Sequence, residues 1–123
     1  MKKRPVNLNL FTIHFPIPAW VSLCHRLSGI FIFLFIPGLL WIFNESLASG
    51  ERFQALGLFF SHPGMRFMLW VLISALLYHL FAGIRHLLMD IHVGESKKAG
   101  RFSAFVVIIF SFIAIMVVGV WLW

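Results

Sequence analysis

Polar residues interrupt the second of three long hydrophobic stretches, and their types are those that bind metals and anions. These residues are Tyr78, His79, Gly83, Arg85, His86 and Asp90. On an α-helix, positions 79, 83, 86 and 90 are spaced i, i+4, i+7 and i+11, so they would share one face. A histidine is costly inside an apolar membrane helix and is expected to face a specific partner or ligand. We therefore expect the chemistry of this chain on that face.

His79 has two interpretations. It is either a polar residue hydrogen-bonded across a helix interface or an axial ligand of haem iron, with neutral imidazole as the donor. Gly83, one turn further on, favours the haem ligand because a flat macrocycle needs a helix surface without side-chain bulk. A close crossing of two helices would explain this glycine equally well.

A second polar group lies before the first hydrophobic stretch, where His25 and Arg26 form a pair like Arg85 and His86. Haem carries two propionates, and a ring held at His79 would direct them about 10 Å along the helix, the rise between residues 79 and 86. Arginine and protonated histidine give charge-assisted hydrogen bonds to such groups. The alternative is that the two arginines extend to lipid phosphates.

Ser22 and Arg26 are spaced i, i+4 and would share a helix face at the membrane boundary. Together they could hydrogen-bond a quinone carbonyl. A helix-start residue beside an interfacial arginine explains the pair as well, and spacing alone favours that simpler interpretation. For Asp90 we expect a salt bridge to an interfacial arginine.

The composition is that of an integral membrane protein. Of the 123 residues, 61% are hydrophobic and only 11% are charged, which leaves too little polar surface for a soluble domain of this size. Cys24 is the single cysteine, so no internal disulfide can form. The net charge of +6 comes from basic residues near the ends of the apolar stretches, a distribution that indicates topology rather than nucleic-acid binding.

Three stretches without acidic or basic residues predict an all-α protein with three transmembrane helices. They run over residues 27–43, 67–84 and 102–123. The first two are slightly short for a hydrocarbon core of about 30 Å, so their helices must extend into flanking polar residues. We therefore expect spans at about 21–44, 65–90 and 102–123 within a single domain, residues 1–123. The connections are expected where glycine and proline occur, at residues 44–50, 62–64 and 94–100.

Lysine and arginine in short loops predict the orientation. They cluster at the N-terminus and in the loop between the second and third spans: Lys2, Lys3, Arg4, Lys97, Lys98 and Arg101. Both regions are expected to face the cytoplasm, which puts the C-terminus on the periplasmic side. Residues 25–26 and 85–90 would then lie at the same depth.

One deep histidine cannot close a six-coordinate haem. His86 is two turns from His79 on the same helix and cannot reach the opposite face of the same iron. Three helices also enclose a macrocycle poorly. We therefore expect a second membrane subunit to pack against this chain in a helix bundle, although a five-coordinate haem would need no second ligand.

Two motifs resemble the cytochrome b membrane-anchor subunit of succinate dehydrogenase. The first is Arg4-Pro5, then Phe15-Pro16, then Ser22-x-x-His25-Arg26-x-Ser28-Gly29, and the second is His79-x-x-x-Gly83-x-Arg85-His86-x-x-x-Asp90. The resemblance covers essentially the whole chain. It implies a multi-pass protein of the bacterial cytoplasmic (inner) membrane, part of respiratory complex II.

The resemblance also implies roles for the residues in these motifs. His79 would be an axial ligand of haem b, with the other ligand from a second small anchor subunit. Ser22 and Arg26 would line a ubiquinone site, and His25, Arg26 and His86 would lie near the haem propionates. An iron–sulfur subunit and a flavoprotein subunit, with their clusters and FAD, would dock at the cytoplasmic face and carry the succinate chemistry.

Two alternatives remain at this point. The chain could be a haem-free structural anchor of the same type of complex, since the family includes such members. It could also be a small transporter or regulator, although a transporter would be expected to carry an acidic residue within a span, and none of the three stretches has one.

Overall fold

The structure, a computed structural model, describes residues 15–123, and in that range it is built from α-helices without any strand. The helices are α1 (Ile17–Ala48), α2 (Gly50–Ser61), α3 (Pro63–Asp90) and α4 (Lys97–Leu122). The all-α prediction is confirmed. Lys2, Lys3 and Arg4, on which part of the predicted orientation rests, and the Arg4-Pro5 element of the first motif lie outside the described residues.

Three of these helices are long and apolar enough to cross a membrane: α1, α3 and α4, with 32, 28 and 26 residues. At about 1.5 Å per residue each exceeds a hydrocarbon core of about 30 Å. The helices therefore continue past the apolar stretches into polar sequence, as expected. Ser22 and Arg26 are helical residues of α1, and Arg85 and His86 are helical residues of α3.

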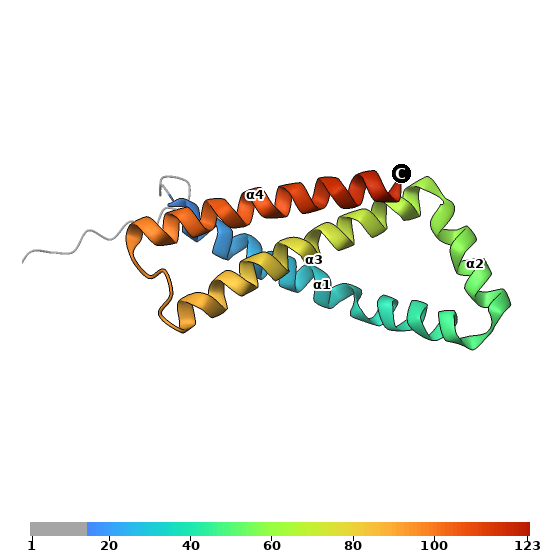
Figure 1. The fold of residues 1–123 in the computed structure, drawn as a ribbon. Coiled ribbons are helices and arrows are strands. Elements are labelled where there is room, and N and C mark those ends of the chain that lie inside the picture. Colours follow the sequence, from blue (N-terminus) through green and yellow to red (C-terminus); the bar gives the residue numbers. More distant parts are fainter. Residues whose placement is uncertain (1–14) are drawn as a thin grey trace, which may run out of the picture.

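Helix α3 is central and contacts the other three helices. Figure 1 shows α4 alongside α3 over most of its length, while α1 crosses α3 at an angle. The start of α1, the end of α3 and the start of α4 lie at one end of the molecule, and α2 and the C-terminus lie at the other. This alternation is what three consecutive spans require.

Two of the expected connections are shorter than the sequence suggested. Residues 44–48 continue α1, and residues 97–100 form the first turn of α4, so Lys97, Lys98 and Arg101 are helical rather than loop residues. For α4 the reason is local capping, because the Ser96 side chain accepts a hydrogen bond from the Ala99 amide at 3.1 Å and starts the helix there. The break at residue 62 lies where it was expected, with His62 capping α3 and Pro63 in its first turn.

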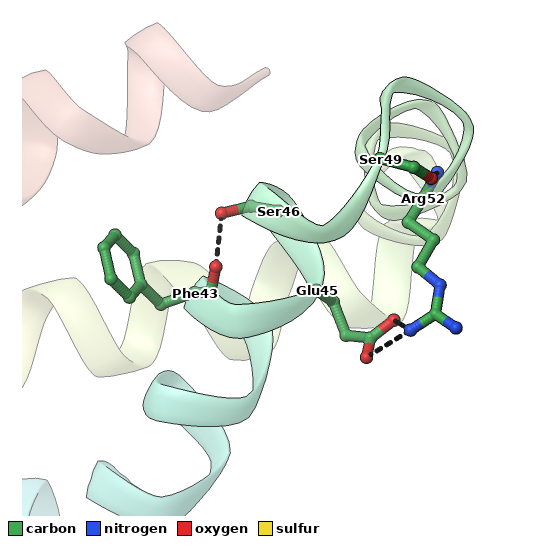
Figure 2. A network of polar contacts seen from close by, with 5 residues as sticks. All are labelled: Phe43, Glu45, Ser46, Ser49 and Arg52. Atoms are coloured by element: carbon green, nitrogen blue, oxygen red, sulfur yellow. Dashed lines mark hydrogen bonds and ion pairs between the residues drawn. The ribbon is translucent and has the colours of Figure 1, made fainter.

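Helix α2 was not expected. Its start is set by Ser49, whose hydroxyl accepts from the Arg52 amide at 3.2 Å. Figure 2 shows the corner that results, in which the Arg52 guanidinium reaches back to Glu45 near the end of α1. One guanidinium nitrogen, Nη1, lies 2.9 and 3.0 Å from the two carboxylate oxygens. Glu45 therefore pairs within the chain, at the end of the molecule opposite the start of α1.

The buried core is small and consists of short side chains. Val21 of α1, Ala82 of α3, and Ala104 and Val107 of α4 are its members. Small residues let helix backbones approach closely, as is common in membrane bundles. Close approach of α1, α3 and α4 is therefore concentrated near the end of the molecule that holds residues 21, 82 and 104.

Two hydrogen bonds from aromatic side chains connect the helices through backbone carbonyls. The Tyr78 hydroxyl of α3 donates to the carbonyl of Val21 on α1 at 2.9 Å. The Trp70 indole of α3 donates to the carbonyl of Ile115 on α4 at 3.1 Å. The first lies one residue from His79 and so helps to fix how α1 is placed against the polar face of α3.

Candidate functional site

Three histidines from two helices form a stack where α1 crosses α3. The His25 ring of α1 lies against the His79 ring, with centroids 4.2 Å apart and planes inclined by 20°. The same ring lies against His86, at 4.9 Å and 20°. Because residues 79 and 86 are two turns apart on one face of α3, the crossing helix inserts His25 between them. We call His79, His25 and His86 the histidine stack.

His79 is held at only one of its two ring nitrogens. Nδ1 lies 3.1 Å from the hydroxyl oxygen of Ser28 and 3.2 Å from the carbonyl oxygen of His25. Nε2 makes no hydrogen bond to any of residues 15–123. The ring is partly buried. Its orientation is therefore fixed by α1, while one nitrogen remains available to a ligand.

Two glycines make this packing possible. A Cβ on Gly29 of α1 would lie 3.0 Å from Cε1 of His79, tighter than most Cβ contacts in proteins. A Cβ on Gly83 of α3 would lie 3.4 Å from Nε2 of His25, at the edge of ordinary contact. Gly83 thus faces α1, consistent with the helix-crossing interpretation, and Gly29 is the tighter of the two positions.

His86 is oriented by its own helix and reaches Ser22. Its Nδ1 lies 2.9 Å from the Ala82 carbonyl, which can only accept, so Nδ1 carries the proton. Nε2 then accepts from the hydroxyl of Ser22, 3.5 Å away. In His25, by contrast, Nε2 is buried and has no hydrogen-bond partner among residues 15–123. A buried polar atom without a partner is costly, and in native sites it often marks a missing ligand or water.

The remaining charged candidates lie apart from the histidine stack. Arg26 is exposed on α1. Arg85 is only 6% exposed and faces α4, donating from Nε to the Ser103 hydroxyl at 3.0 Å and from Nη2 to the Gly100 carbonyl at 3.2 Å. Asp90 is exposed and has no ion pair within residues 15–123.

The structure therefore brings together His25, His79, His86 and Ser22, and it places Arg85 on a different side of α3. Ser28 and Gly29 were part of the first motif, yet the sequence reasoning gave them no role. Their spacing carried a signal, because Ser28 is three residues from His25 and so lies on the same helix face. Helix α1 therefore presents three features to His79: the Ser28 hydroxyl, the His25 carbonyl and the backbone of Gly29, which has no side chain.

The donor set fits a haem. Within residues 15–123, Nε2 of His79 has no hydrogen-bond partner whereas Nδ1 is hydrogen-bonded, which is the usual arrangement of a metal-ligating histidine. His25 and Arg26 supply donors for anionic groups near the same end of α1. Two apolar cavities elsewhere, of about 360 and 390 Å³, lie between α3 and α4 and among α1, α2 and α3, and no member of the histidine stack lines either.

Comparisons with known proteins point to one family. The family model described as "Succinate dehydrogenase/Fumarate reductase transmembrane subunit" matches residues 1–118. A relative from Coxiella burnetii, named succinate dehydrogenase cytochrome b556 subunit, is 47% identical over 98% of both chains. Proteins with the same name from Rickettsia felis and Rickettsia bellii are 30% and 33% identical, over 96% and 89% of this chain and 92% and 85% of their own.

Proposed function

The chain belongs to the succinate dehydrogenase/fumarate reductase transmembrane subunit family, and from that membership we propose that it is the haem b-binding membrane anchor of a succinate:quinone oxidoreductase. The names of its relatives, cytochrome b556 subunits of succinate dehydrogenase, support this proposal. The chain would not be an enzyme by itself. It would help to pass electrons from an iron–sulfur subunit to ubiquinone and would dock the catalytic subunits on the membrane.

One observation carries the haem assignment, namely the state of His79. Its Nδ1 is engaged by oxygens at 3.1 and 3.2 Å, and its Nε2 has no partner within the described residues. We therefore propose Nε2 of His79 as an axial ligand of haem iron. When bound, haem b would supply a one-electron carrier within the membrane.

The haem propionates are proposed to bind His25, Arg26, Arg85 and His86. His25 supports this best, because its buried Nε2 lacks a partner among residues 15–123 and an anion would provide one. Arg26 is exposed and has no competing contact among the described residues. Arg85 can join only by giving up Ser103 and Gly100 on α4, so its participation would require a change of side-chain conformation.

The quinone is proposed to bind at Ser22 and Arg26, on adjacent turns of α1. The Ser22 hydroxyl donates weakly, over 3.5 Å, to Nε2 of His86. A hydrogen bond of that length is easily exchanged for a quinone carbonyl oxygen. The guanidinium of Arg26 would donate to the same oxygen, and His86 would remain close enough to exchange a proton with the serine.

The rest of the electron path lies on other chains in this proposal. A second small anchor subunit would donate the other haem ligand, and an iron–sulfur subunit and a flavoprotein subunit with FAD would carry out succinate oxidation. The complex would lie in the bacterial cytoplasmic (inner) membrane, with its catalytic subunits at the end where α1 starts and α3 ends.

Haem content tests the ligand assignment. In the complex purified through a tag on this chain, His79→Ala should remove the reduced-minus-oxidised haem b signal. The matched control is His62→Ala, at the far end of α3, where the exposed ring only caps the helix; it should keep the signal. A full haem complement in the His79→Ala complex would show that His79 is not a haem ligand.

Two activities measured in parallel test the quinone site. Ser22→Ala and Arg26→Leu should lower succinate-driven quinone reduction by about 10-fold or more, because each removes a hydrogen bond that a polar substrate depends on. Succinate oxidation with an artificial acceptor should be unchanged, since that chemistry would lie on partner subunits. Arg66→Leu, at the opposite end of the bundle, is the control. Equal losses in both assays would reject a quinone role for these residues.

A further inference from the structure

Ser28 of α1 contacts the ring of His79 but has no part in the function proposed above. Its hydroxyl oxygen lies 3.1 Å from Nδ1 of His79 and 2.8 Å from the carbonyl oxygen of His25. The same carbonyl oxygen lies 3.2 Å from Nδ1. Hydroxyl, carbonyl and ring nitrogen therefore form a closed triangle between α1 and α3.

We propose that Ser28 is a positioning residue that fixes His79 as the Nδ1–H tautomer. Ser28 thereby sets how strongly Nε2 of His79 binds a metal and at what potential that metal is reduced. This inference rests on the proposed role of His79 as an iron ligand. It adds a residue that acts through the ligand rather than on the iron.

Counting protons in the triangle gives the tautomer. The carbonyl oxygen of His25 has no proton and can only accept. The single hydroxyl proton of Ser28 has its shorter and better placed acceptor in that carbonyl, at 2.8 Å. Two oxygens thus face Nδ1 with lone pairs, and only a proton on Nδ1 makes both contacts attractive. In neutral imidazole the other nitrogen, Nε2, then carries the free lone pair that a metal needs.

The ring cannot easily leave this arrangement. The backbone of Gly29 lies so close that an added Cβ would be 3.0 Å from Cε1 of His79. On its other side the ring stacks on His25 at 4.2 Å. Turning the ring over would bring Cδ2 to the position of Nδ1, facing the two oxygens, and would lose both contacts. The hydrogen bonds therefore select the tautomer, and the packing holds the ring in that orientation.

The hydrogen bonds at Nδ1 should change the haem midpoint potential in a definite direction. A histidine that donates Nδ1–H to an acceptor becomes a more basic ligand through Nε2. A more electron-rich ligand stabilises the oxidised, more positive iron over the reduced one. Removing the Ser28 hydroxyl should therefore make the haem midpoint potential more positive. The change should be partial, because the His25 carbonyl remains 3.2 Å from Nδ1.

The experiment is a redox titration of haem in the purified complex for three serine variants. Ser28→Ala removes the hydroxyl, and Ser28→Thr restores it, because a threonine hydroxyl also bonds to the preceding turn of its helix. Ser74→Ala is the matched control, since Ser74 is a partly buried membrane-helix serine that donates only to its own helix, at 2.7 Å to the Trp70 carbonyl. Haem content and the ferric haem electron paramagnetic resonance spectrum are recorded for each.

Ser28→Ala should shift the reduction equilibrium toward reduced haem by about two- to tenfold, the range that one hydrogen bond spans; the upper end is about 59 mV for one electron. Ser28→Thr should return to the wild-type potential, and Ser74→Ala should not move it. If Ser28→Ala loses haem while Ser28→Thr keeps it, the result would also support a positioning role for the Ser28 hydroxyl, with a larger effect on haem binding.

Three results would overturn the inference: an unchanged potential in Ser28→Ala, an equal shift or haem loss in Ser28→Thr, or an equal shift in Ser74→Ala. The His79→Ala complex separates this failure from that of the proposed function. If His79→Ala keeps its haem, the ligand assignment itself is wrong. If it loses haem while Ser28→Ala behaves like wild type, only the role of Ser28 is wrong.

Discussion

At the scale of single residues, three identical side chains are given different properties by their neighbours. His79 is held through Nδ1 by two oxygens of α1. His86 is held through Nδ1 by its own helix, at the Ala82 carbonyl. The Nε2 atom of His25 is buried without a partner among residues 15–123. Imidazole chemistry is the same in all three, so the roles proposed for them, iron ligand, quinone-side group and anion-binding group, rest on these different contacts.

His25→Phe separates the stacking role of this ring from its polar role. Phenylalanine keeps an aromatic surface against His79 and removes the unpartnered nitrogen, so assembly of the complex should be preserved. Haem retention should fall by about 10- to 100-fold, because a charge-assisted hydrogen bond to a propionate is lost. The measurement is haem per complex after dilution into detergent with a haem acceptor. Retention equal to wild type would remove His25 from the propionate site.

The sequence predicted the face that carries the histidines, since helical spacing alone determines it. It did not predict the direction of Arg85. That residue was assigned by depth, but it precedes His86 by one position and is therefore rotated about 100° around the helix. The rotation takes its guanidinium to Ser103 and Gly100 of α4.

The sequence did not predict the contact of Ser28 with His79. A serine in a helix usually hydrogen-bonds to its own backbone, and that habit gives no sign of a second contact.

At the scale of helices, the site depends on how closely α1 can approach α3. The buried residues there, Val21 and Ala82, are small, and a Cβ added at Gly29 would lie only 3.0 Å from the ring of His79. Substituting one glycine should therefore be more damaging than substituting any exposed polar residue at the corner between α1 and α2.

Gly29→Ala should disturb the haem site. The added Cβ would meet Cε1 of His79 at 3.0 Å, so either the ring or the helix must shift, and a misplaced ligand should lower haem affinity by about 10-fold or more. Gly38→Ala is the matched control on the same helix, because no atom lies within 4 Å of its added Cβ. Equal haem contents in the two variants would show that the α1–α3 crossing is looser than described.

Arg52→Gln should have little effect, although it breaks the ion pair with Glu45. Arg52 is 59% exposed in its side chain, and its pair with Glu45 lies at the corner drawn in Figure 2. Exposed pairs contribute about 0–1 kcal/mol. The thermal stability of the complex measures this, and a loss beyond that range would mean that the corner holds α2 in place.

The sequence predicted the three long helices because uninterrupted apolar stretches have few other solutions in a bilayer. It did not predict α2, or that the helix α4 starts as early as Lys97, because those features depend on caps. Ser49 and Ser96 each start a helix by accepting one backbone hydrogen bond, within sequence that otherwise resembles a loop. Glycine at position 50 in particular suggested a connection, whereas it is the first residue of α2.

At the scale of the whole molecule, most of the apolar surface is exposed. Only Val21, Ala82, Ala104 and Val107 form the buried hydrophobic core among the described residues, whereas large side chains such as Trp121, Val120 and Leu58 are more than 70% exposed. Soluble proteins rarely expose so large an apolar surface to water. Lipid and partner subunits must cover it. The stability of this fold therefore depends on the membrane and the complex rather than on the contacts within the isolated chain.

The orientation in the membrane remains a prediction. The end formed by the start of α4 carries Lys97, Lys98 and Arg101, and the opposite end carries Arg52 and Arg66 together with Glu45 and Glu51. The excess of positive charge predicts that the first of these ends is cytoplasmic. A C-terminal alkaline phosphatase fusion, active only outside the cytoplasm, should be active. A fusion after Gly94 should be inactive, and the reverse pattern would invert the topology.

The central claim is that His79 binds the haem iron, and a ligand exchange tests it most directly. His79→Met keeps a side chain that can ligate iron but replaces imidazole with a thioether, which raises the haem potential. Electron paramagnetic resonance and redox titration of the purified complex should therefore show retained haem with an altered low-spin signal and a more positive potential. Retained haem with the wild-type signal and potential would contradict the claim.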